Sequence, residues 1–201
     1  MSPRRSKAEA ANTHESIVRE AAEGASEIGL EGISIGSLAT SLGMSKAGVA
    51  GHFQSKQDLQ IEVVEFGARD FTEKVWEPNK DLPQGRERLL GCLDTWYAYS
   101  ASSPFRGGCL MTSVSTEFDG RPGPVREKIA ETWGRWTLVL RNDLDQAISA
   151  GELSPPLSPA DTITAIESLA AGVNQQTQLY ASKSPEKTAS AAARVLLGIL
   201  D

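Results

Sequence analysis

Few residues of this chain have the type and spacing that catalysis requires, and Ser34 is the first to consider. It is the centre of a Gly-x-Ser-x-Gly pattern that runs from Gly32 to Gly36. In hydrolases this pattern exposes a serine nucleophile between a strand and a helix, and a later histidine activates it. Here a helical pattern precedes Ser34, and the only later histidine, His52, follows with no acidic residue between the two. We therefore interpret Ser34 as the cap of a helix and expect no catalytic residue.

Side chains that bind metals well are equally sparse. The candidates are His14, His52, Cys92 and Cys109. None of them falls in the C-x-x-C or H-x-x-x-H spacing of common zinc sites, so we expect neither a metal nor another cofactor. Two cysteines without a framework of spacings also fit a reducing compartment.

The distribution of charged residues along the sequence suggests a locally cationic surface. The first 60 residues hold six basic and seven acidic residues, a net charge of −1, and the whole chain carries −6. Residues 33–56 nevertheless contain Lys46 and Lys56 and no acid. Charges are screened over about 8 Å at physiological ionic strength, so local placement decides whether a phosphate backbone is attracted.

Individual cations have alternative roles. Lys56 lies in the first turn of a predicted helix, where a cation is slightly unfavourable, so we expect it to contact a DNA phosphate rather than only solvent. His52, whose flank beside Gly51 should be exposed, is expected to contact phosphate as well, with local capping or packing as the alternative. Arg4 and Arg5 either enter a minor groove or belong to a solvated tail.

The elements that position these residues are two short helices. Ser34 caps a helix with apolar residues at helical spacing, and Gly43 ends it because glycine adopts a left-handed conformation without strain. Ser45 caps a second helix over residues 46–52. Two capped helices joined by so short a turn predict a helix-turn-helix, whose second helix enters the DNA major groove.

The run LGMSKAGVAGHFQSKQDLQ, residues 42–60, resembles the signature of TetR-family transcriptional regulators. The matching positions are Ser45, His52, Phe53, Ser55, Lys56 and Leu59. Ala50 stands where that family usually has an aromatic residue, often a tyrosine that contacts phosphate. The resemblance covers about residues 12–66 and extends more weakly to residues 107–110 and 117–127.

This resemblance implies a helix-turn-helix domain at residues 1–55 and an effector-binding and dimerisation domain at residues 56–201. It also implies a repressor, not an enzyme, that a small, largely apolar effector releases from a palindromic operator. The expected DNA face comprises Ser34, Ser45, Lys46, Ala47, Gly48, Gly51, His52 and Lys56. Gly48 and Gly51 leave the second helix nearly bare, so phosphate contacts and DNA shape should contribute more to specificity than base contacts. The alternative is a helical carrier or enzyme that uses a pocket in the body.

Beyond the helix-turn-helix, apolar residues recur only at helical spacing. The sequence therefore predicts an all-α protein of about nine helices. The expected helices span about residues 12–29, 34–42, 45–52, 55–76, 84–102, 109–118, 124–150, 158–182 and 185–200, the first of them capped by Asn12 or Thr13. No apolar run approaches the ~20 residues of a membrane span, and the N-terminus lacks the apolar segment of a secretory signal. We expect a cytoplasmic protein without membrane contact.

Aromatic residues in the body are ambiguous, because aromatics at helical spacing are most often core. In the resembling regulators the corresponding helices enclose an effector. The candidate ligand-binding residues are Trp96, Tyr97, Cys109, Trp133, Trp136, Gln175 and Gln178. The glutamines would supply the few polar groups that a mostly apolar pocket needs.

The last two predicted helices carry two apolar stripes. The first comprises Ile163, Ile166, Ala170 and Val173, and the second comprises Ala189, Ala192, Ala193, Leu196, Leu197 and Leu200. The resemblance implies that two copies of the chain pair these stripes in a two-fold four-helix bundle. Inward packing within one chain is the alternative.

Overall fold

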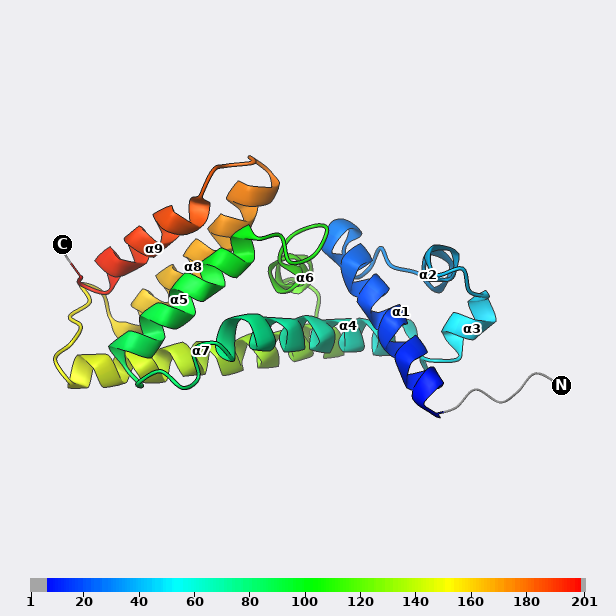
Figure 1. Ribbon diagram of the computed structural model, residues 1–201, viewed down its shortest axis with the longest axis horizontal. Helices are drawn as coiled ribbons and strands as arrows, with labels where there is room; N and C mark the ends of the chain where they lie inside the picture. Colours follow the sequence, from blue (N-terminus) through cyan, green and yellow to red (C-terminus); the bar gives the residue numbers. More distant parts are fainter. Residues whose placement is uncertain (1–6, 200–201) are drawn as a thin grey trace. The chain divides into compact units, whose positions relative to one another are not determined.

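The computed structural model describes residues 7–199, which form helices, turns and loops (Figure 1). The α-helices are α1 (Lys7–Ile28), α2 (Ile35–Ser41), α3 (Lys46–Ala50), α4 (Lys56–Phe71), α5 (Arg86–Ala101), α6 (Leu110–Phe118), α7 (Pro124–Ser149), α8 (Pro159–Gln178) and α9 (Pro185–Leu196), and a π-helical segment, η1 (Thr72–Trp76), follows α4. Within the described range these nine α-helices confirm the all-α prediction. Arg4, Arg5 and Leu200, for which the sequence suggested roles, lie outside that range.

Two helix ends differ clearly from the sequence prediction, the start of α1 and the end of α4. Asn12 and Thr13 do not cap α1 but lie inside it, where the Thr13 hydroxyl donates to the Glu9 carbonyl at 2.8 Å. Alanine, lysine and glutamate before them are strong helix formers, so the helix extends toward the N-terminus. The predicted helix of residues 55–76 is α-helical only to Phe71 and then widens into η1.

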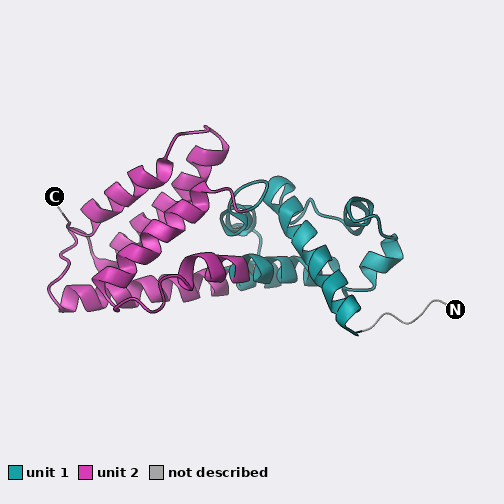
Figure 2. Cartoon of the chain, in the orientation of Figure 1, with its two compact units in different colours: residues 1–68, 105–129 teal, residues 69–104, 130–201 magenta. Residues whose placement is uncertain are grey.

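The described helices belong to two compact units (Figure 2). The first unit comprises residues 1–68 and 105–129, and the second comprises residues 69–104 and 130–201. The chain passes from one unit to the other within α4, in the loop between residues 104 and 105, and within α7. The functional division expected from the sequence, residues 1–55 and 56–201, stays a prediction.

The first unit is built around α1. Its stripe of Ile17, Ala21 and Ala25 is fully buried, and α1 packs against both α2 and α6. Leu38 of α2 and Val49 of α3 are buried as well. Two helices as short as α2 and α3 cannot bury enough apolar surface by themselves, so α1 supplies the surface on which they fold.

The second unit is organised by the mutual packing of α5, α8 and α9 (Figure 1). A buried ion pair joins α5 to α7, because Arg88 donates to both carboxylate oxygens of Asp143 at 2.8 and 2.9 Å. Arg194 of α9 makes a similar bidentate contact with Asp94 of α5. In the part of the chain that the structure describes, no helix is long and apolar enough to cross a membrane.

Candidate functional site

The first candidate site starts at α2, whose beginning and end are both fixed by hydrogen bonds. The Ser34 hydroxyl accepts from the Ser37 amide at 3.1 Å, and the Ser37 hydroxyl accepts from the Ser34 amide at 3.2 Å. This reciprocal pair is a capping box, and it satisfies two amides that a helix start would otherwise leave free. The interpretation of Ser34 as a cap is therefore confirmed.

Gly43 creates the turn between α2 and α3. Its φ of 63° is left-handed, as predicted, and no other atom lies within 4 Å of where a Cβ would stand, so the backbone angle alone favours glycine. The Met44 amide then donates to the Ala39 carbonyl at 2.9 Å and the Gly43 amide to the Thr40 carbonyl at 3.3 Å. This pair of bonds is the Schellman motif that ends a helix and redirects the chain.

Helix α3 is short, capped and largely bare. The Ser45 hydroxyl accepts from the Gly48 amide at 3.0 Å, and an alanine Cβ at Gly48 would press within 3.1 Å of that hydroxyl. Val49 is fully buried and anchors α3. The exposed members of the expected DNA face are Ser34, Ser45, Lys46, Ala47, Gly51 and Lys56, while Gly48 and His52 are partly exposed. The structure thus leaves one side of α3 open to a partner.

Lys56 has a role inside the chain that sequence reasoning did not anticipate. Its ammonium donates to the Glu31 carbonyl at 2.6 Å and to the Glu31 carboxylate at 3.1 Å. Gln60 donates to the same carboxylate at 3.0 Å and to the Leu30 carbonyl at 3.1 Å. Hydrogen bonds from Gln60 and Lys56 hold the pKa of Glu31 below its ordinary value. Lys56 therefore holds the loop before α2, and its contact with DNA phosphate stays a prediction.

His52 packs locally. Its ring centroid lies 5.5 Å from that of His14 and 6.4 Å from that of Phe53, and His14 in turn pairs with Glu62. This arrangement matches the packing role that was the alternative for His52, and phosphate contact stays a prediction.

The acidic residues of α1 are occupied by the loop that precedes α6. Arg106 pairs with Glu27 at 3.0 Å and with Glu20 at 3.3 Å, and its backbone amide donates to Glu23 at 2.8 Å. Gly107 allows the loop to come this close, because a Cβ there would lie 2.0 Å from the Ser26 carbonyl oxygen. One guanidinium thereby offsets part of the negative charge of Glu20 and Glu27, and a backbone amide binds Glu23.

The second candidate site is a cluster of aromatic rings in the second unit, centred on Phe71. Its ring centroid lies 5.8 Å from Trp96, 5.6 Å from Tyr99, 5.8 Å from Trp133 and 5.1 Å from Trp136, each in an edge-to-face arrangement. We call these five residues the Phe71 cluster. The structure thus brings together three candidates from the sequence, Trp96, Trp133 and Trp136.

Tyr97 stacks on Trp96 at 6.3 Å but points to α8, where its hydroxyl donates to the Ile166 carbonyl at 3.2 Å. Burial raises the pKa of Tyr97, so the phenol stays protonated. Tyr97 therefore borders the cluster and joins α5 to α8.

The other three ligand candidates lie elsewhere. Gln175 and Gln178 are exposed, and the Gln178 amide donates to the Ser103 hydroxyl at 2.6 Å. Cys109 is buried but belongs to the first unit. Sequence reasoning missed the central position of Phe71, because an aromatic residue within a helical pattern does not show which other rings will gather around it.

Catalytic and metal chemistry finds little support among the described residues. No group of three or more histidine, cysteine or acidic side chains there is placed to hold a metal ion. Burial raises the pKa of Cys92 to about 12, which keeps this thiol protonated and unreactive.

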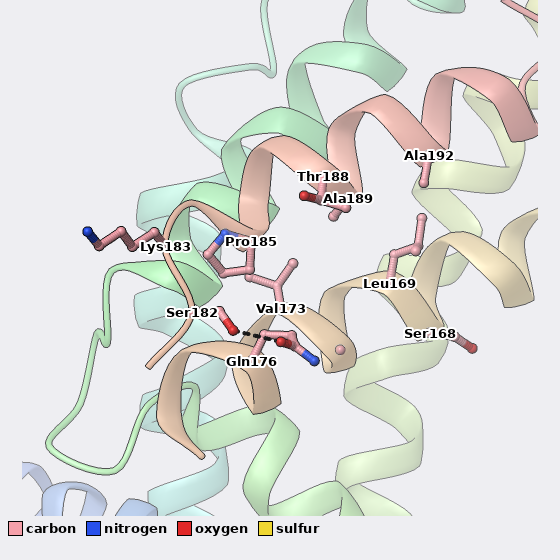
Figure 3. A pocket seen from close by; sticks show the side chains of 11 residues that line it. Ser168, Leu169, Val173, Gln176, Ser182, Lys183, Pro185, Thr188, Ala189 and Ala192 are labelled. Atoms are coloured by element: carbon pink, nitrogen blue, oxygen red, sulfur yellow. Dashed lines mark hydrogen bonds between the residues drawn. The ribbon is translucent and has the colours of Figure 1, made fainter. Parts of the chain in front are cut away.

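The apolar stripes of α8 and α9 pack inward. Within one chain Ile163, Ile166, Ala170, Val173, Ala189, Ala193 and Leu197 are all buried. Most of the stripe residues thus follow the alternative of inward packing, whereas Ala192 and Leu196 stay partly exposed, and the pairing of two copies through α8 and α9 stays a prediction. A groove of about 390 Å³ lies between α8 and α9, and its lining includes Val173, Ala189 and Ala192 of the two stripes (Figure 3). Leu169 and Gly172 contribute from α8, and Thr188 and Ala192 from α9.

Known proteins resemble the chain in sequence and in fold. The family model described as the C-terminal domain of tetracyclin repressor-like proteins matches residues 85–193, just over half of the chain. Among curated proteins, a sequence search finds no significant match.

Solved structures of transcriptional regulators share the fold. A TetR regulator from Chloroflexus aurantiacus J-10-FL superimposes with a TM-score of 0.83 at 21% identity, over 92% of this chain and 94% of the other. AibR, solved in complex with isovaleryl coenzyme A and operator DNA, gives 0.77 at 21% identity, over 92% and 97%. FadR from Bacillus subtilis, solved with stearoyl-CoA, gives 0.73 at 17% identity, over 93% and 100%.

Proposed function

This chain belongs to the TetR family of transcriptional regulators, and we propose that it is a repressor that a small, largely apolar effector releases from a near-palindromic operator. The observation that carries the proposal is the pair of capped helices α2 and α3, joined by a Schellman turn at Gly43, with one side of α3 exposed. A helix presented in this way fits the major groove of DNA.

The side chains of α3 define what kind of DNA recognition is expected. Lys46 is the only cation on α3, and Ala47, Gly48 and Gly51 offer no group that reads a base edge. The backbone of α3 can therefore approach the groove closely, and the amides and Lys46 contact phosphates. Specificity then comes mainly from phosphate positions and DNA shape.

The effector is proposed to bind at the Phe71 cluster. Large apolar side chains with few polar groups are typical of small-molecule sites, and the cluster includes three of the residues that the sequence singled out. Two proteins of the same fold were solved with acyl-coenzyme A molecules, so uncharged acyl thioesters without the charged coenzyme are the first compounds to test. An effector releases DNA only if it binds the released conformation more tightly than the DNA-bound one.

Dimerisation is proposed to use the outward faces of α8 and α9, with the partly exposed Ala192 and Leu196 of the second stripe and without the buried residues of the stripes. Small residues such as Gly172 and Ala192 line the groove there, and Val195 leaves 56% of its surface exposed. Two chains paired across this surface would form an isologous interface. Their recognition helices would then contact half-sites about one helical turn, roughly 10 base pairs, apart.

Binding of the full chain to the intergenic DNA upstream of its own gene tests the proposal. A gel shift should show a complex that weakens steeply as salt rises, because bound phosphates release counterions on complex formation. The absence of any salt-dependent complex would favour the alternative of a helical carrier or enzyme.

The effector part has a separate test on the same complex. Compounds that release wild-type protein from DNA should fail to release the Trp133→Ala, Trp136→Ala variant and should change wild-type tryptophan fluorescence. Release of the variant at wild-type concentrations would place the effector away from the Phe71 cluster.

A further inference from the structure

Four buried polar side-chain atoms in the described part of the chain have no hydrogen-bond partner, and all four lie in the second unit. They are Trp96 Nε1, Ser100 Oγ, Trp136 Nε1 and Thr177 Oγ1. Buried polar groups in folded proteins are rarely left in this state, so each exception calls for an explanation. Tryptophan N–H groups in particular usually find a partner when buried.

Two of these atoms belong to the Phe71 cluster, and a third is beside it. The Trp96 and Trp136 ring centroids are 5.6 Å apart, and both rings contact Phe71. Ser100 follows Trp96 by four positions in α5, so the two side chains share one face of that helix. Unpaired hydrogen-bonding groups are therefore concentrated around one apolar ring.

Phe71 stands at a change of helix type. It is the last residue of α4, directly before the π-helical segment η1. A π-helical turn is less favourable than continued α-helix and occurs often at functional sites. The backbone hydrogen-bond register therefore changes directly after Phe71.

The unpaired groups specify the ligand. An indole N–H is a donor only, so its partner must be an acceptor. One charged side chain in contact with the cluster is Asp70, which accepts from the Tyr99 hydroxyl at 2.9 Å and is paired with Lys74. An anionic ligand would be buried beside this carboxylate, and a cationic one would face the two N–H donors. Both cases are unfavourable.

We propose that the Phe71 cluster is the closed form of a binding site for an uncharged, largely apolar molecule with a carbonyl or ether oxygen. The oxygen accepts hydrogen bonds from Trp96 and Trp136, and the apolar part takes the place of the Phe71 ring. This inference rests on the proposed effector site and adds the chemistry of the ligand.

The test uses the full chain with ¹⁵N-labelled tryptophan and two probes of similar shape. Acetophenone carries a carbonyl oxygen, and ethylbenzene lacks it. Trp96→Phe and Trp136→Phe assign the indole N–H signals, and Trp76, whose ring lies under the Arg88 guanidinium and outside the cluster, is the reference. Phe71→Ala removes the ring that the probe would otherwise have to displace. Phe71→Leu is used instead if the alanine variant does not fold.

Acetophenone should move the Trp96 and Trp136 signals downfield in wild type and, at lower concentration, in the Phe71 variant, while ethylbenzene should not. Trp96→Phe should weaken acetophenone binding about fivefold more than ethylbenzene binding, as loss of one neutral hydrogen bond implies. Equal shifts with both probes, or none with acetophenone in the Phe71 variant, would overturn the proposal. Indole signals that show contact with a bound water and do not change when acetophenone is added would also overturn the proposal.

The DNA gel shift separates this inference from the proposed function. Indole shifts without DNA binding would refute the proposed repressor function and support the proposed ligand chemistry. Salt-dependent DNA binding without indole shifts would support the proposed repressor function and refute the proposed ligand chemistry.

Discussion

The carboxylate of Glu117 accepts a hydrogen bond of 3.0 Å from the backbone amide of Glu31, 86 positions earlier in the chain. Its other oxygen accepts from the Leu30 amide at 2.7 Å. Gly29, with a φ of 78°, lets the loop wrap around this carboxylate, because a Cβ there would lie 2.8 Å from a Glu117 oxygen. Helix α6 therefore holds the loop that leads into α2, and with it the position of the helix-turn-helix.

Glu117→Gln should lower the free energy of unfolding by about 1–3 kcal/mol, because one buried backbone amide loses a charged acceptor. An amide side chain offers a single oxygen and presents its NH₂ group to the second backbone amide. Urea denaturation measures the effect, and Glu127→Gln, at an exposed site of α7, is the control. A loss no larger than that of the control would show that the carboxylate does not hold the loop.

This contact also shows where sequence reasoning reaches its limit. Ser34, Gly43 and Ser45 act within a few residues of themselves, so their roles as caps and turn could be predicted from local spacing. Glu117 lies in an ordinary helical pattern, and nothing local indicates that its partners are the amides of Leu30 and Glu31. Long-range hydrogen bonds of this kind depend on the tertiary fold and leave no periodic signal.

The sequence motif identified Lys56, but nothing local indicated that Glu31 is its partner within the chain. Lys56→Ala should weaken binding to all DNA sequences alike and reduce the slope of log K against log salt by about one unit. The stability lost with the exposed Glu31 pair should be small, about 0–1 kcal/mol. Titrations at several salt concentrations, with Lys80→Ala as a control in the second unit, measure the slope. An unchanged slope would show that Lys56 contacts Glu31 but not the DNA phosphates.

Glu167 predicts a pH dependence of stability. This half-buried residue of α8 accepts a hydrogen bond from Thr137 of α7, and burial raises its pKa. Because the folded-state pKa lies above the unfolded one, the folded state binds the proton more tightly. The contribution of Glu167 to stability is therefore greatest below the ordinary carboxyl pKa and is lost as pH rises through the folded-state pKa.

Glu167→Gln keeps an acceptor for Thr137 and removes the charge. It should therefore raise the melting temperature at about pH 7.5 and change it little at about pH 4, where a carboxyl of raised pKa is already protonated. Thermal denaturation at both pH values, beside Glu127→Gln, measures the difference. An equal effect at both pH values would mean that the charge of Glu167 does not govern stability.

The apolar stripes of α8 and α9 mark a second limit of the sequence. Their spacing correctly indicated helices with one apolar face, but an apolar stripe does not say whether its partner lies in the same chain. Ala189, Ala193 and Leu197 are buried in the single chain, so deletion of residues 185–201 would expose the core of the second unit. Such a deletion would unfold the unit instead of separating two copies, and a point substitution on the outer face is the sharper test.

Gly172 offers that substitution. A Cβ at this position meets no other atom within 4 Å, so the single chain accepts a side chain in the groove between α8 and α9. Gly172→Arg should fold at least as stably as wild type, because arginine favours a helix interior by about 0.5–1 kcal/mol over glycine. In a dimer across this groove, two arginines would be buried near the two-fold axis without partners, which is strongly unfavourable. We therefore expect Gly172→Arg to sediment as a monomer and to lose tight binding to the palindromic operator.

Gly134→Arg is the matched control, since Gly134 lies in α7 with equally open surroundings. A Gly172→Arg protein that still sediments as a dimer, or a wild-type monomer that protects both half-sites, would exclude this surface as the dimer interface.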